Sequence, residues 1–370
     1  MNNYTRVRDV FIILPSLIAI AVILTTCNSV PQKVPKSNSS FASVQKDFTI
    51  VSPVLDQVFT QNDTIQFLLN KENSLLKPDS TQLYINGEKR SSINNNALDF
   101  KISSVSKKVG RQNIRIKLFY NDSLEQSISS RITILSDIIP KKLDYRVLKK
   151  IPHNEKSFTQ GLMFHNGFLY EGTGRNNESA LNKIDPVTGK TILQRKLDRK
   201  YFGEGITYYN DHIYQITYRS QVGFVYNAES FELIREFDLQ TSQGWGLTTD
   251  GKSLIMSDGS SLLYFFDPDY FTLVSQLDVC DNKASQTNLN ELEYVNGCIW
   301  ANVYGETYII KIDAETGKVI SKLDLIEIFP ESIPPDIDHV LNGIAYNNEK
   351  QSYFITGKLW PVIYEIKIIE

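Results

Sequence analysis

A set of polar and aromatic side chains recurs at regular intervals in the second half of the sequence. Each is followed by a glycine, or once by Glu291, and then by an aliphatic residue. The set contains one carboxylate, one indole and three carboxamides, at Glu204, Trp245, Gln160, Asn290 and Asn342. A lone carboxylate among amides can move protons if burial raises its pKa. The alternative, strongest for Asn342, is that these side chains only satisfy buried backbone groups or water.

The same repeat indicates the elements that carry these residues. The aliphatic residues stand at positions 162, 206, 247, 292 and 344, so the intervals are 44, 41, 45 and 52. Within them, short β-branched and aromatic runs are separated by turn pairs such as Asn210-Asp211, Asp250-Gly251 and Asn296-Gly297. Such pairs indicate hairpins, and four antiparallel strands per repeat are typical of a β-propeller. First strands line the channel of a propeller, so we expect the recurring side chains to converge at one mouth.

The last repeat is incomplete. After Asn342 only three candidate strands follow, Ile344–Tyr346, Tyr353–Thr356 and Val362–Ile366. The segment Tyr145–Ile151, which precedes the first repeat, has the pattern of an outer strand, and its pairing there would leave no open sheet edge. We therefore predict an all-β chain with a five-bladed β-propeller over residues 139–370.

Composition excludes some classes of protein and leaves others open. The chain of 370 residues has a net charge of -3 and no run of Lys or Arg, which argues against nucleic-acid binding. Its four histidines and three cysteines show no metal-ligand spacing. Cys280 and Cys298 could form a disulfide in an oxidising compartment or remain as two separate thiols.

The first residues have the pattern of a targeting segment. Arg6 and Arg8 precede a short apolar run that ends at Leu24, and Cys27 follows two threonines. This resembles a bacterial lipoprotein signal over residues 1–27, with Cys27 as the lipidated residue; the alternative is an uncleaved membrane anchor. We expect a flexible tether over residues 28–44 and an extracytoplasmic protein, lipid-anchored to a bacterial membrane on the periplasmic side or at the cell surface.

Residues 45–138 are predicted to form a separate small β domain. Six candidate strands in about 90 residues suit an immunoglobulin-like sandwich without a disulfide. The candidate strands are Thr49–Val51, Ile65–Leu68, Gln82–Ile85, Phe100–Ile102, Asn113–Tyr120 and Ser127–Ile134. None of them carries residues that suggest chemistry, so a spacer or docking module is expected.

Several motifs of residues 144–368 together resemble plant-type glutaminyl-peptide cyclotransferase. They are Phe158–Leu162, Phe202–Thr207, Gly244–Leu247, Ser257–Ser260, Asn290–Tyr294, Trp300–Asn302, Val340–Ala345 and Thr356–Pro361. The resemblance implies a five-bladed propeller, in agreement with the repeat. It also implies cyclisation of an N-terminal glutamine to pyroglutamate, with release of ammonia and with no metal or other cofactor required. The partners would be peptides or proteins that begin with glutamine, and the chain would be a monomer.

The resemblance also implies roles for individual residues. Glu204 matches the family's general acid/base, and Asn290 and Lys358 match positions that hold or polarise the substrate amide. The substrate-binding positions are Gln160, Tyr218, Trp245, Tyr304 and Asn342; Tyr218 and Tyr304 replace residues that are normally Trp in this family. Other readings are a surface position for Lys358 and a core position for Trp245. Trp300 and Trp360 are expected to be packing residues.

Two other functions are compatible with the sequence. A propeller that has lost catalysis through changes such as Tyr218 and Tyr304 would bind peptides or glycans at the cell surface. A metal-dependent lactonase-type propeller would need carboxylate and Asn ligands at the channel.

Overall fold

The computed structural model is built almost entirely of β-strands. It describes residues 48–71, 78–94, 98–103, 106–120, 124–333, 336 and 338–369. In these ranges there is no α-helix, one 3-10 turn occurs at Ile326–Ile328, and no helix could cross a membrane. The all-β prediction is confirmed. The predicted signal segment 1–27 with Cys27 and the tether 28–44 lie outside the described residues.

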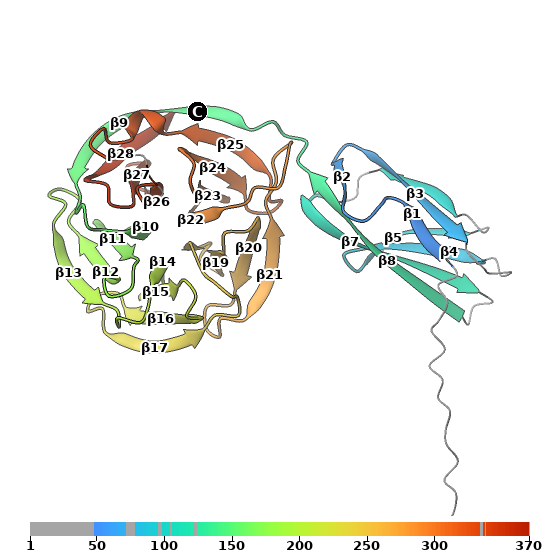
Figure 1. Ribbon diagram of the computed structural model, residues 1–370, viewed down its shortest axis with the longest axis horizontal. Helices are drawn as coiled ribbons and strands as arrows, with labels where there is room; N and C mark the ends of the chain where they lie inside the picture. Colours follow the sequence, from blue (N-terminus) through green and yellow to red (C-terminus); the bar gives the residue numbers. More distant parts are fainter. Residues whose placement is uncertain are drawn as a thin grey trace, which may run out of the picture. The chain divides into compact units, whose positions relative to one another are not determined.

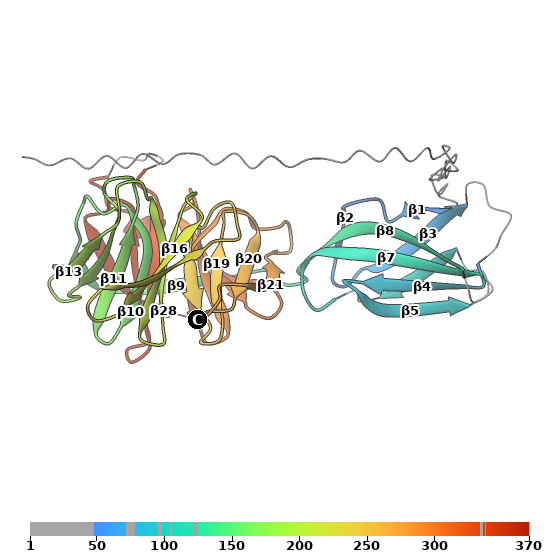
Figure 2. The same cartoon turned by 90° about the horizontal axis from the view of Figure 1, so that it is seen from below.

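The N-terminal part consists of two facing sheets (Figure 2). One has the order β1-β3-β6 (Phe48–Ser52, Thr64–Lys71, Asp99–Ser103), and the other β2-β8-β7-β4-β5 (Gln57–Thr60, Leu124–Leu135, Gly110–Tyr120, Ser80–Ile85, Glu88–Asn94). Alternate residues of β3, β4 and β7 are buried in a common core, as period-two patterning requires. All six predicted strands are present. Strands β2 and β5 were not predicted, because β2 is short and the largely exposed β5 lacks an apolar alternation.

Residues 159–278 form three four-stranded antiparallel sheets, each in sequence order. The turn residues Asn210 and Asp211 have φ of 47° and 61°, and Asn296 and Gly297 have 50° and 82°, as two-residue hairpins require. The strands are β10–β13 (Thr159–His165, Phe168–Thr173, Ala180–Ile184, Thr191–Lys196), β14–β17 (Gly203–Tyr209, His212–Thr217, Val222–Asn227, Leu233–Asp238) and β18–β21 (Leu247–Thr249, Leu254–Ser257, Leu262–Phe266, Leu273–Asp278).

The remaining strands share one eight-stranded sheet that is joined by β9 (Lys141–Pro152). Its members are β22–β25 (Leu289–Val295, Cys298–Val303, Tyr308–Asp313, Val319–Asp324) and β26–β28 (Leu341–Asn347, Ser352–Gly357, Val362–Ile369). Strand β9 pairs antiparallel with β28, with Ile151 opposite Ile363, so the predicted pairing of Tyr145–Ile151 with the last repeat is confirmed. Its first residues also pair in parallel with β25, which was not predicted. Figure 1 shows β9 at the outer edge between β25 and β28.

The first strands contact one another in a closed cycle: β10 with β14, then β18, β22, β26 and again β10 (Figure 1). An apolar cluster lies between each neighbouring pair of strand groups. Trp300 and Trp360 are 1% and 0% exposed in the cluster between β22–β25 and β26–β28, which confirms the prediction that they pack. Burial between successive sheets therefore holds the central strands in place.

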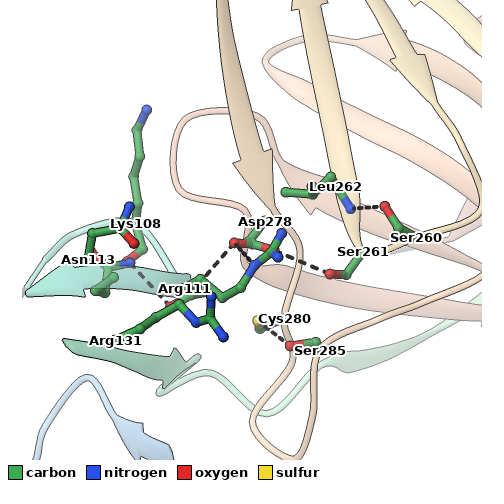
Figure 3. A network of polar contacts seen from close by, with 12 residues as sticks. Lys108, Arg111, Asn113, Arg131, Ser260, Ser261, Leu262, Asp278, Cys280 and Ser285 are labelled. Carbon is green, nitrogen blue, oxygen red and sulfur yellow. Dashed lines mark hydrogen bonds and ion pairs between the residues drawn. The ribbon is translucent and has the colours of Figure 1, made fainter. Parts of the chain in front are cut away.

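Polar contacts connect the ends of the N-terminal strands to the sheet β18–β21 (Figure 3). Asp278 accepts hydrogen bonds from the backbone and side chain of Arg111, at 3.0 and 3.4 Å. Cys280 lies nearby, 3.5 Å from the hydroxyl of Ser285. No disulfide joins Cys280 and Cys298, so the disulfide left open by the sequence is not formed. They lie apart because Cys280 bridges to Ser285 and Lys318, whereas Cys298 pairs with Asp313 in β24.

Candidate active site

The recurring residues are brought together by β-bulges at the starts of the first strands. The pairing register shifts at Thr159/Gly161 in β10, Gly203/Ile206 in β14, Leu289/Leu292 in β22 and Leu341/Ile344 in β26. A bulge turns a side chain out of the regular alternation. Gln160, Glu204, Asn290 and Asn342 all stand within these bulges, and Trp245 lies just before β18.

A cavity of about 220 Å³ lies at this point. Seven of the eight residues predicted to act or bind there line it: Gln160, Glu204, Tyr218, Trp245, Asn290, Tyr304 and Lys358. Phe158 and Phe202 also line it and were not singled out from the sequence. Each of them stands two residues before a recurring residue, a signal within the repeat that could have identified both.

Asn342, the eighth predicted residue, is not part of the cavity wall. It is fully buried, and its amide donates to Gln160 Oε1 at 3.3 Å and to the carbonyl of Thr159 at 3.0 Å. Asn342 therefore lies behind Gln160 and supports it. This geometry does not place Asn342 in direct contact with a bound molecule. The physical reason is that its side chain is held by β10, the neighbouring first strand.

Each pair of neighbouring repeats is linked by a polar contact near the cavity. Gln160 Nε2 donates to Glu204 Oε1 at 3.1 Å, and the amide of Gly205 donates to the carbonyl of Trp245 at 2.8 Å. Ser257 Oγ donates to the carbonyl of Asn290 at 2.7 Å. The last two links join β22 to β26 through Glu291, and β26 to β10 through Asn342. This network fixes the relative positions of the cavity residues.

The glycines after the recurring residues allow this close approach. A Cβ on Gly205 would lie 2.4 Å from the amide nitrogen of Leu247, and one on Gly246 would lie 2.0 Å from the carbonyl oxygen of Asn290. Any side chain at these positions would push neighbouring first strands apart. The repeated glycine is thus required by the packing of backbone against backbone.

Glu204 is the carboxyl group of the cavity wall. It is 4% exposed, and burial raises its pKa well above the usual range, although the positive charge of Lys358 opposes this. Burial disfavours the charged form of an acid, which accounts for the direction. A carboxyl group with a raised pKa can both donate and accept a proton near neutral pH.

Lys358 faces the same cavity from the loop after β27. It is 4% exposed, so the surface position considered from the sequence is wrong. Its ammonium lies 4.7 Å from the ring centre of Phe158 and 5.0 Å from that of Tyr304. Burial lowers the pKa of Lys358 to about 8, against the effect of Glu204, which raises it. The group is therefore a cation in neutral solution, held over aromatic faces.

The rest of the wall consists of aromatic rings and the carboxamides of Gln160 and Asn290. Trp245 and Tyr304 meet edge to face with ring centres 5.8 Å apart, and the rings of Phe202 and Tyr218 are 5.7 Å apart. Among the described residues, neither Trp245 Nε1 nor Asn290 Oδ1 has a hydrogen-bond partner although both atoms are buried. A buried polar atom without a partner is costly, so one donor and one acceptor of the wall are available to a bound molecule.

A buried ion pair supports the segment that carries Gln160. His153 Nε2 lies 2.9 Å from Glu171 Oε1, and Glu171 also accepts hydrogen bonds from the hydroxyls of Ser157 and Thr159. Burial opposes both charges, yet His153 keeps the pKa of Glu171 below its usual value and Glu171 raises the pKa of His153. This pair was not predicted from the sequence, because its members share no motif with the recurring residues.

The described residues contain no group of three or more His, Cys, Asp or Glu side chains placed to hold a metal ion.

Comparison with known proteins connects this geometry to a reaction. A family model for glutamine cyclotransferase matches residues 123–368, starting before the 144 expected from the sequence motifs. A glutaminyl-peptide cyclotransferase of Arabidopsis thaliana is 38% identical over 229 residues, which are 61% of this chain and 71% of the relative. The crystal structure of Myxococcus xanthus glutaminyl cyclase is similar with a TM-score of 0.58 and 30% identity, over 62% of this chain and 98% of that one.

Proposed function

Because the chain belongs to the glutamine cyclotransferase family, we propose that it is a glutaminyl-peptide cyclotransferase with Glu204 as its general acid/base. The α-amine of an N-terminal glutamine attacks the carbon of its own side-chain amide. A C–N bond closes the five-membered lactam, the bond to the amide nitrogen breaks, and ammonia leaves.

The observation that carries the role of Glu204 is its position. It lines the cavity, it is 4% exposed with a raised pKa, and Gln160 holds one of its oxygens at 3.1 Å. The attack is intramolecular, so the protein has to hold the folded conformer and move one proton. We assign both proton steps to Glu204: its carboxylate takes a proton from the attacking nitrogen, and the resulting acid gives it to the departing nitrogen.

Lys358 and Asn290 are assigned to the substrate amide. The ammonium of Lys358 stabilises negative charge that develops on the amide oxygen, because a cation fixed in a site poor in water acts strongly on such charge. The Asn290 oxygen and the Trp245 N–H, which lack partners, are suited to a substrate N–H and a substrate carbonyl respectively. Gln160, Tyr218 and Tyr304 complete the binding wall. Compared with the family's usual Trp, the two Tyr side chains offer a smaller and more polar surface.

We propose that the reaction needs no metal or other cofactor, since proton transfer and amide polarisation are both within reach of protein groups. The test is ammonia release from a peptide that begins with glutamine, measured for the wild type with and without chelator and for Glu204→Gln. We expect no effect of chelator and a loss of about 10²- to 10⁴-fold in kcat for the variant. Full activity of Glu204→Gln would remove Glu204 from the mechanism. Tight peptide binding without ammonia release by the wild type would favour the non-catalytic binding propeller.

We infer further that residues 139–370 form a five-bladed β-propeller and residues 45–138 an immunoglobulin-like sandwich. The cyclic order of contacts among β10, β14, β18, β22 and β26 supports the first, and the two facing sheets of the N-terminal part support the second.

We also propose a monomer outside the cytoplasm, attached to a membrane through lipidated Cys27. The lipoprotein-like pattern of residues 1–27 supports this. Labelling with a fatty acid that is lost in Cys27→Ser would test it, and equal labelling of that variant would contradict it.

A further inference from the structure

Glu291 is an exception to the repeat that builds the active site. The corresponding residues of the other repeats are Gly161, Gly205, Gly246 and Gly343. At Gly205 and Gly246 even a Cβ would collide with the backbone of the next first strand. Position 291 instead carries a long side chain, and that side chain is 0% exposed. Burying a carboxyl group is costly unless it is hydrogen-bonded, so Glu291 needs contacts that compensate for its burial at this position.

Those contacts connect three first strands. Glu291 Oε1 accepts from the amide of Leu162 in β10 at 3.1 Å, and Oε2 accepts from the amide of Ile344 in β26 at 2.7 Å. Both amides follow directly on the bulges that hold Gln160 and Asn342, where the ladder is interrupted. A carboxyl group from β22 thus completes the hydrogen bonding of two bulges in other strands.

The same contacts lead to the proposed acid/base. Asn342 donates to Gln160 Oε1 at 3.3 Å, and Gln160 Nε2 donates to Glu204 Oε1 at 3.1 Å. Asn290, the residue before Glu291, lines the cavity. One side chain is therefore connected to the backbone of β10 and β26 and, through Asn342 and Gln160, to the carboxyl group of Glu204.

We propose that Glu291 is a positioning residue for the cyclisation: by bridging the amides of Leu162 and Ile344, it sets the place of Gln160 against Glu204. The inference rests on the proposed role of Glu204. It predicts an effect on the chemical step more than on substrate capture, since the aromatic wall of Tyr218, Trp245 and Tyr304 does not depend on these bonds.

Glu293 provides a matched control. It lies two residues further along β22, is partly buried, and accepts a backbone hydrogen bond from Tyr346 of β26 at 2.9 Å. That bond joins β22 to β26 alone, whereas the bonds of Glu291 also reach β10, the strand that carries Gln160. Glu293→Gln therefore makes the same chemical change in the same strand and removes neither hydrogen bond of the bridge, although the charge of Glu293 contributes to the raised pKa of Glu291.

The test compares Glu291→Gln with Glu293→Gln by steady-state kinetics and thermal unfolding. A carboxamide has one acceptor oxygen, so it cannot accept from both amides, and one bulge loses its partner. Burial raises the pKa of Glu291, and the two amide donors oppose this; burial also raises the pKa of Glu293, to about 8, so the paired variant controls for the loss of the ionisable group. We expect kcat to fall about 10- to 100-fold in Glu291→Gln with KM changed less than about threefold, and both constants to stay within about threefold of wild type in Glu293→Gln.

Two further measurements separate positioning from general weakening. In a Gln160→Ala background, Glu291→Gln should lower kcat little further, because the effects of mutations in residues that act through one another are not additive. A crystal structure of Glu291→Gln should show the contact between Gln160 and Glu204, 3.1 Å in the wild type, lengthened or broken.

An unchanged kcat in Glu291→Gln, an equal loss in Glu293→Gln, full additivity with Gln160→Ala, or an unchanged contact between Gln160 and Glu204 would overturn the inference. The crystal structure of the variant tests the bridge without an activity assay. A wild-type chain that releases no ammonia would count against the proposed function instead, and the bridge would still be judged from that contact.

Discussion

Replacement of Lys358 by methionine should make the protein more stable and less active at the same time. Methionine keeps the length and apolar body of the side chain and removes the charge. The pKa of Lys358 is lowered from 10.5 to about 8, a difference of about 2.5 pH units, and burial is the main cause. At 1.36 kcal/mol per pH unit, holding this charge costs the folded state roughly 3 kcal/mol.

The variant is freed from this cost, but part of the resulting gain in stability is offset by a lost contact. The ammonium over Phe158 and Tyr304 contributes about 0.5 to 2 kcal/mol, which methionine does not replace in full. We therefore expect a net gain of about 1 to 3 kcal/mol in the free energy of unfolding at pH 7. Loss of a group that stabilises the developing oxyanion should lower kcat by about 10²- to 10³-fold.

The pH dependence has a definite sign. Below about pH 8 Lys358 is charged in both the folded and the unfolded state, so the wild type bears the full burial cost. Between about pH 8 and 10.5 the folded state releases the proton first, the stability contribution of this site rises, and the advantage of the variant should shrink.

Denaturant unfolding at pH 7 and pH 10 measures the stability difference, and ammonia release measures kcat. Comparing lysine with methionine at position 358 in a Glu204→Gln background removes the interaction between the charges of Glu204 and Lys358 from the comparison. A methionine variant that is less stable than wild type at pH 7, or whose advantage is equal at both pH values, would refute the idea that charge burial dominates. Wild-type kcat in that variant would refute the role of the ammonium.

Two further predictions concern the cavity wall and the packing of first strands. Trp245→Phe keeps an aromatic wall but removes the indole N–H, which lacks a hydrogen-bond partner. We expect kcat/KM to fall about 3- to 10-fold while the thermal unfolding temperature stays nearly unchanged. Unaltered kinetics would exclude that donor from substrate binding. Gly246→Ala places a Cβ 2.0 Å from the carbonyl oxygen of Asn290 and should destabilise the fold by at least about 1 to 3 kcal/mol, measured by denaturant unfolding. Gly251→Asn, at an open turn with φ of 82°, should cost much less, and equal costs would contradict the packing argument.

Much of the fold could be predicted from local pattern. Turn pairs such as Asn296-Gly297 indicated hairpin positions because few residues accept positive φ at both places. The strand Tyr145–Ile151 was recognisable as the partner of the last repeat because its pattern matches the other outer strands. Its parallel pairing with β25 had no such signal, and β5 was missed because an exposed edge strand needs no apolar face.

The sequence by itself determined which residue types stand at the start of each first strand, and their period implied that they meet. Only the tertiary structure decided what each does there. Asn342 lies behind the cavity wall, Lys358 is buried over aromatic rings, and Glu291 reaches two other strands because the bulges leave backbone amides without ladder partners. Such contacts join residues at least 53 positions apart, so no local spacing encodes them. Burial and bulge geometry, which exist only in the folded chain, place the carboxyl group of Glu204 and raise its pKa.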